Sequence, residues 1–162
     1  MRTRFWARRP LALATALALA AILPACGGGS SGGGGNAPTT LPPAPVRTLL
    51  IQGNFSLASA ADVVGAPADI WRHEFTTSGT GNLEVNADWT FATSQMAVGV
   101  LRGSCSFAQI IADACAEVVG TFPASKPARL NVSNLAAGTY TFVMVNVNNR
   151  AESGNYQVYL TR

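Results

Sequence analysis

His73 is the only histidine of the 162-residue chain, so any histidine-dependent catalysis would have to use it. Serine and aspartate are plentiful enough for a Ser–His–acid hydrolase, but no Gly-x-Ser-x-Gly motif occurs. His73 also alternates in phase with Trp71 and Phe75, as residues of one strand face do. We therefore predict a histidine in the core or at its rim, and keep a small envelope hydrolase using His73 as an alternative function.

The carboxylates are scattered rather than paired for catalysis or metal binding. Glycoside hydrolysis needs two facing carboxylates, yet Glu84 and Asp88 alternate with apolar residues and so belong to a solvated strand face. Calcium needs several converging oxygens. The remaining acids near loops match no calcium-loop spacing: Asp62 with Asp69, and Asp113 with Glu117. We predict no catalytic residues, no metal site and no cofactor, with calcium as the open alternative.

The N-terminal segment has the organisation of a signal peptide. A basic stretch, 1–9, precedes residues 11–23, which are apolar except for Thr15. Those thirteen residues would span about 20 Å as a helix. A bilayer core of about 30 Å needs about 20 residues, so we predict a signal peptide over 1–25 rather than a membrane span.

The residues after the apolar stretch indicate the type of signal. Leu23-Pro24-Ala25-Cys26 resembles the lipobox of bacterial lipoproteins, in which cleavage precedes a cysteine that carries lipid. The resemblance implies that Cys26 is lipidated and anchors the protein to a membrane. Gly27 follows that cysteine where an inner-membrane lipoprotein would have aspartate. By resemblance to Gram-negative lipoproteins, we expect the outer membrane, facing the periplasm or the cell surface.

Cys105 and Cys115 remain once Cys26 is assigned to lipid. A pair of cysteines in an exported protein favours a disulfide. Their spacing of ten, with no histidine nearby, argues against zinc, and no Cys-x-x-Cys redox motif is present. We predict a structural disulfide between them.

Composition separates a tether from a folded domain. Residues 26–45 contain the lipid cysteine, a Gly/Ser run and four prolines, which is typical of a flexible linker. Four of the eleven basic residues lie within the first nine positions, leaving seven basic against eight acidic residues in 46–162. That near-neutral 117-residue remainder fits one domain and argues against a nucleic-acid partner.

Period-2 alternation recurs from residue 46 onward, and turn residues separate the alternating segments. It is clearest in 82–89, where Leu83, Val85, Ala87 and Trp89 alternate with polar residues. We predict about eight strands in an antiparallel β-sandwich of jelly-roll type. Segments 96–102, 117–122 and 139–147 are apolar on both faces, so we expect central or covered strands there. The weakly helical windows 58–64 and 107–115 are expected to be loops with at most a helical turn.

The C-terminal part carries a family resemblance. The Ala137-Gly138-Thr139-Tyr140 turn and strand, and then Gly154-Asn155-Tyr156-Gln157-Val158-Tyr159-Leu160, resemble the closing hairpin of bacterial pre-peptidase C-terminal domains. The resemblance extends over about 70–161, although 94–98 lacks the Asp-rich run of that family. It implies a β-sandwich accessory module that is not itself a catalyst.

Aromatic residues suggest where a partner could bind. Tyr140, Phe142 and Met144 share one phase of their strand, opposite Val143 and its neighbours. If the valine phase faces the core, these three could join Tyr159 in an exposed apolar strip for a sugar or protein partner. The alternative is that the N-terminal strand or the disulfide loop covers them.

Taken with the absence of a catalytic motif, these features predict a lipid-anchored, non-catalytic binding or accessory module of the cell envelope. The alternative is a carbohydrate-binding module that uses Trp89, Tyr140, Phe142 or Tyr159 as stacking platforms.

Overall fold

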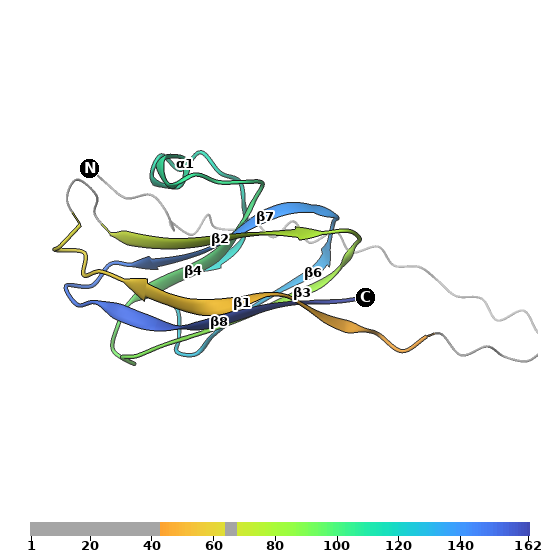
Figure 1. The fold of residues 1–162 in the computed structure, drawn as a ribbon, viewed down its shortest axis with the longest axis horizontal. Coiled ribbons are helices and arrows are strands. Elements are labelled where there is room, and N and C mark those ends of the chain that lie inside the picture. The colour runs from red at the N-terminus through yellow and green to blue at the C-terminus, as the bar shows by residue number, and fades with distance from the viewer. Residues whose placement is uncertain (1–42, 64–67) are drawn as a thin grey trace, which may run out of the picture. The chain divides into compact units, whose positions relative to one another are not determined.

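The computed structural model describes residues 43–63 and 68–162, and Figure 1 shows its fold. The predicted signal peptide, Cys26 and most of the predicted tether therefore lie outside the described residues. Within the described part there are eight strands and one short helix, in this order: β1 (Arg47–Leu57), β2 (Asp69–Thr77), β3 (Gly81–Trp89), β4 (Met96–Arg102), α1 (Phe107–Ile111), β5 (Glu117–Thr121), β6 (Ala128–Leu135), β7 (Gly138–Asn146) and β8 (Glu152–Thr161).

The strands form two four-stranded antiparallel sheets packed face to face. Sheet A has the order β1-β8-β3-β6 and sheet B the order β2-β7-β4-β5. Successive strands alternate between the sheets, except that β4 and β5 pair within sheet B. This arrangement is the eight-stranded jelly roll, so the predicted fold class is confirmed.

The core lies between the sheets and is built from alternate residues of each strand. On β3 the inward residues are Leu83, Val85, Ala87 and Trp89, all buried as the alternation predicts. Aromatic rings meet across the core, with the Phe142 and Tyr156 centroids 4.9 Å apart. Because each such ring buries a large apolar area, these contacts contribute strongly to the stability of the sandwich.

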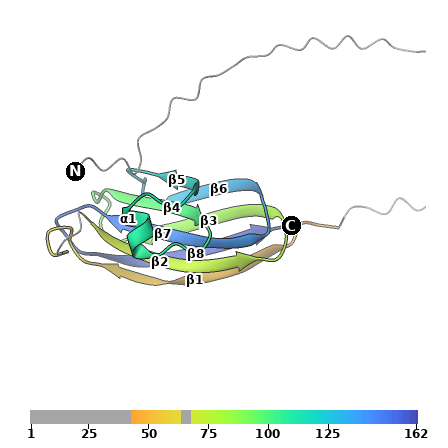
Figure 2. The same ribbon diagram turned by 90° about the horizontal axis from the view of Figure 1, so that it is seen from above.

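Antiparallel pairing separates the two ends of the sandwich. At the end where β1 begins, here called the terminal end, Val46 and Arg162 exchange backbone hydrogen bonds of 2.7 and 3.0 Å. Figure 2 shows the C-terminus beside the start of β1. The opposite end, here called the loop tip, carries four connections: β1–β2, β3–β4, β5–β6 and β7–β8.

Two details of the strand predictions need separate comment. β4 and β7 are central strands, as expected, but β5 lies at the edge of sheet B and is only half-buried, so the expectation of a central or covered strand is not met there. Its residues are mostly half-buried because Val118 and Val119 contact the core only from the rim of the sheet. The window 107–115 contains α1, a single short helix within a loop, as predicted.

Within the described residues, no helix has the length and apolar character needed to cross a membrane.

Candidate functional site

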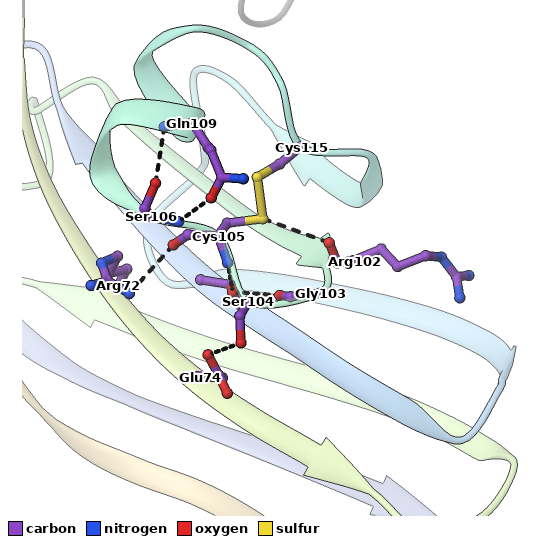
Figure 3. The surroundings of a disulfide bond; sticks show 10 residues. Arg72, Glu74, Arg102, Gly103, Ser104, Cys105, Ser106, Gln109 and Cys115 are labelled. Atoms are coloured by element: carbon purple, nitrogen blue, oxygen red, sulfur yellow. Dashed lines mark hydrogen bonds between the residues drawn. A yellow bond between two sulfur atoms is a disulfide. The ribbon is translucent and has the colours of Figure 1, made fainter.

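Cys105 and Cys115 are bonded to one another, as predicted, with their Cα atoms 6.3 Å apart. The bond closes a lobe, here called the disulfide lobe, that consists of residues 103–116 and includes α1 (Figure 3). α1 begins with a capping box, in which Ser106 and Gln109 each accept a backbone hydrogen bond from the other residue. The lobe is therefore braced covalently at its base and by side-chain capping at its helix.

The disulfide lobe covers the outer face of sheet B. Its buried Ile110 packs with Leu101 and Val143, whose side chains point away from the main core. The Cys105 amide donates to Thr141 Oγ1 at 3.0 Å, and Arg72 donates to the Cys105 carbonyl at 3.3 Å. A dry outer face beneath this lobe explains why β7 is apolar on both of its faces.

The exposed strip that would follow from an inward-facing valine phase is not formed on β7. Tyr140, Phe142 and Met144 are 0% exposed and face the core between the sheets, while Val143 faces the disulfide lobe. With apolar residues on both faces, alternation could not tell which phase pointed inward. Trp89 is also buried, at 3% exposure, so three of the four proposed sugar-stacking rings are inaccessible.

Tyr159 is the fourth residue of the predicted strip, and it is the one that lies on an outer face. It points out of sheet A and is half-buried. The Arg47 guanidinium lies 3.5 Å from the centroid of its ring and also forms a 3.0 Å ion pair with Glu84. One face of this ring is thus covered by a held cation rather than presented to solvent.

His73 lies on β2, half-buried at the rim of the core, as the alternation predicts. Its Nδ1 is hydrogen-bonded to the Tyr156 hydroxyl, and the two rings meet edge to face with centroids 5.8 Å apart. Among the described residues, this is the one side-chain hydrogen bond that the His73 ring makes. The arrangement fixes the imidazole against a core aromatic instead of against a serine hydroxyl.

The acidic residues of the described segments do not converge. No group of three or more His, Cys, Asp or Glu residues among residues 43–63 and 68–162 could hold a metal ion. Asp69 accepts a hydrogen bond from the Ala58 amide at 2.7 Å, which ties the end of β1 to the start of β2. Asp62 accepts one from the Ser59 hydroxyl within the β1–β2 connection. Partial burial raises the pKa of the Glu117 carboxyl, and the nearby Asp113 raises it further.

The outer face of sheet A, here called the amide face, has a different character. No described segment covers it as the disulfide lobe covers sheet B. Cross-strand pairs place polar residues in register, with Gln157 between Gln52 and Asn86, and Asn155 between Asn54 and Asp88. A hollow of about 220 Å³ lies on this face. Its polar lining residues are Glu84, Asn86, Asp88, Arg129, Asn155 and Gln157.

The loop tip gathers exposed apolar side chains. Phe91 of β3–β4, Phe122 of β5–β6 and Val147 of β7–β8 are 39%, 37% and 39% exposed. Neighbouring connections are joined by hydrogen bonds, from Lys126 Nζ to the Thr90 carbonyl and from the Ala124 amide to the Met96 carbonyl. These loops are thus fixed to one another on a rigid scaffold, as binding loops commonly are.

A buried glutamate that the sequence analysis did not single out organises the loop tip. Glu152 is 2% exposed, and its carboxylate accepts hydrogen bonds from the amides of Thr90 and Phe91 and from the Ser94 hydroxyl. Such charge-assisted bonds to a buried carboxylate hold a loop firmly. A signal was present, because Glu152 shares the inward phase of Tyr156 on its strand.

Amides extend this network to the neighbouring connection. The buried Asn146 donates to the carbonyls of Ala58 and Arg150, both at 2.8 Å. Asn148 bonds to both the amide and the carbonyl of Gln95, each at 2.9 Å. The β1–β2, β3–β4 and β7–β8 connections are therefore linked through side-chain hydrogen bonds.

No protein-family model matches the chain, and no curated protein matches it either. The resemblances to lipoprotein signals and to pre-peptidase C-terminal domains therefore stay predictions from the sequence.

Proposed function

We propose that the protein is an outer-membrane lipoprotein whose jelly roll serves as a non-catalytic binding module for a protein partner. The lipobox-like segment ending at Cys26 supports the anchor, and residues 27–45 supply the tether. The jelly roll is the part that engages the partner.

The observation that carries this proposal is the position of the loop tip relative to the start of the chain's folded part. The polypeptide enters β1 at Val46, beside Arg162 at the terminal end. Phe91, Phe122 and Val147 are exposed at the opposite end, on three connections that hydrogen bonds hold together. A chain anchored through its N-terminus can thus engage a partner with the end that is free of the attachment.

The chemistry of the loop tip favours a protein partner. Interfaces concentrate aromatic and arginine side chains at their centres. Here the Arg150 guanidinium lies 3.6 Å from the centroid of the Phe91 ring and also donates to Thr93 and Ser94 at 3.1 Å. Because Arg150 is already held in place, less side-chain entropy is lost when a partner covers it.

Site-specific photo-crosslinking in intact cells tests the binding role. A photoreactive residue placed at position Phe91, and separately at position Phe122, should each cross-link this protein to a partner protein and give a single adduct of defined mass. Phe107 on α1 provides a matched control, because it is an aromatic residue of similar exposure (42%) that belongs to the disulfide lobe and not to a loop-tip connection. Absence of adducts at both loop positions, or the same adducts at Phe107, would refute binding through the loop tip.

The anchor has a separate test. Mass spectrometry of the mature protein should find Cys26 as a modified N-terminal residue, and Cys26→Ser should move the protein from the membrane to the soluble fraction. A mature chain that starts elsewhere and remains membrane-bound after this substitution would contradict the lipoprotein proposal.

A further inference from the structure

The amide face contains a built polar hollow that the loop-tip proposal does not use. The hollow spans β6, β3 and β8, where Asn86 lies in register between Arg129 and Gln157, and Asp88 lies beside Asn155. The outer face of sheet B is covered by the disulfide lobe, whereas no described residue covers the hollow. It is therefore a concave surface that extends from the central strands β8 and β3 to the edge strand β6, with its polar groups facing outward.

The polar groups of the hollow divide into occupied and free ones. Asn86 donates to Glu84 at 2.7 Å, so these two side chains hold each other in place. Within the described residues, the side chains of Arg129, Asn155 and Gln157 make no hydrogen bond, and all three are exposed. The hollow thus offers a guanidinium donor and two amides, each of which can donate and accept.

Each carboxylate of the hollow has a neighbouring cation, and Arg129 is an additional positive charge. Glu84 forms its ion pair with Arg47 at 3.0 Å, and Asp88 lies 3.6 Å from Lys126 Nζ. Each carboxylate therefore has a cation beside it but keeps lone pairs that can accept further hydrogen bonds. A strongly anionic ligand would meet these carboxylates, and an apolar ligand would leave the amides unpaired, which is costly.

From this set of groups we infer that the hollow on the amide face binds a neutral glycan segment. Adjacent hydroxyls of a sugar each donate and accept, which matches amide side chains that carry both functions and carboxylates that accept. The row of Gln52, Gln157, Asn86 and Arg129 crosses four strands. At about 4.8 Å between strands the row extends roughly 14 Å, enough for a short oligosaccharide lying across the sheet.

This binding mode differs from the aromatic stacking expected from the sequence. Trp89, Tyr140 and Phe142 are buried, so hydrogen bonds rather than exposed rings provide the recognition. Tyr159 lies directly opposite Glu84 at the margin of the hollow, with Arg47 over its ring. Affinity is expected in the millimolar range, because a few exposed hydrogen bonds contribute little net free energy each.

The test is an NMR titration of the isotope-labelled full chain with three neutral probes: cellotriose, chitotriose and maltotriose. At least one should shift the side-chain amide signals of Asn86, Asn155 and Gln157 together. Asn155→Ala and Gln157→Ala should each raise the dissociation constant about fivefold, the loss expected for one net hydrogen bond. Both residues are exposed, so the variants should keep the native spectrum elsewhere.

Asn131→Ala is the matched control, because Asn131 is an exposed asparagine on the same face of β6 but is not a lining residue of the hollow. It should leave the dissociation constant unchanged. The inference is overturned if none of the three probes shifts these signals, or if Asn131→Ala weakens binding as much as Gln157→Ala.

The glycan inference stands apart from the loop-tip proposal. Gln157→Ala should leave cross-linking from Phe91 and Phe122 intact, and replacing those phenylalanines should leave the titration unchanged. A negative result in the glycan titration therefore leaves the loop-tip proposal standing, and a negative cross-linking result leaves the glycan inference standing.

Discussion

Removing the disulfide should destabilise the whole domain rather than only the disulfide lobe. In the chain-entropy model, a cross-link with a sequence separation of 10 restricts the unfolded chain by about 2.7 kcal/mol at room temperature. The double variant Cys105→Ser/Cys115→Ser should lose about that much free energy of unfolding. For a domain of this size the loss corresponds to a decrease of about 11 °C in melting temperature.

The structure explains why the effect should be global. The disulfide lobe is held by hydrogen bonds to Arg72 and Thr141, and its Ile110 packs on Leu101 and Val143. If the lobe opened, the contacts of Ile110 with Leu101 and Val143 would be lost, and the outer face of the central strands β4 and β7 would be exposed to water. Stability of the lobe and of sheet B is therefore expected to be coupled.

The assay is urea unfolding of a soluble chain that lacks residues 1–26, followed by tryptophan fluorescence, with the double variant beside the oxidised parent. With a slope of about 1.5 kcal/mol per molar urea, the midpoint should fall by about 1.8 M. Adding reductant to the parent should reproduce the result for the variant and leave the variant unchanged. Equal midpoints in the parent and the variant would refute the reasoning, because the lobe would then open without affecting the sandwich.

Three further predictions address the core and the ionisable groups. Phe142→Ala should lower the free energy of unfolding by about 3–5 kcal/mol, because Phe142 is fully buried, whereas Phe107→Ala should lower it by less than about 1 kcal/mol. Similar losses for the two variants in denaturant unfolding would contradict the assigned core face. His73→Ala should lower stability by about 1–2 kcal/mol through lost contact with Tyr156, and any hydrolytic activity should be unchanged; loss of such activity would favour the hydrolase alternative. The pKa of the Glu117 carboxyl is raised in the folded state, so the ionised carboxylate destabilises the fold, and this cost disappears as pH falls from 7 through the raised pKa towards 4.5. Glu117→Gln should therefore raise the melting temperature at pH 7 but not at pH 4. An equal effect at both pH values would contradict this assignment.

The loop tip combines the residues that we propose for binding with a polar network of side chains. Glu152 fixes the β3–β4 connection through two backbone amides and the Ser94 hydroxyl. Because Phe91 is held both by this carboxylate and by the Arg150 guanidinium, the exposed ring has a defined orientation. A preformed loop end of this kind suits recognition of a specific partner better than a mobile loop would.

The number of strands, the fold class and the disulfide could all be predicted from the sequence. Sheet A has a solvated outer face, so its strands alternate visibly, as Leu83 and Val85 do against Glu84 and Asn86 on β3. The same alternation correctly placed His73 on the inward face of β2 and Glu84 on the outer face of sheet A. Alternation is informative wherever one face of a strand contacts water and the other contacts the core.

Tertiary structure alone decided the remaining features. On β7 both faces are dry, since Phe142 packs in the core and Val143 packs beneath the disulfide lobe, and the sequence therefore carried no signal for the inward phase. The edge position of β5 follows from sheet order, which local patterning does not encode. Phe91, Phe122 and Val147 lie at the same end because the jelly-roll connections bring distant segments to it. Burial on both faces, strand order and contacts between distant segments are properties of the assembled fold, which is why the surfaces proposed for binding emerged only from it.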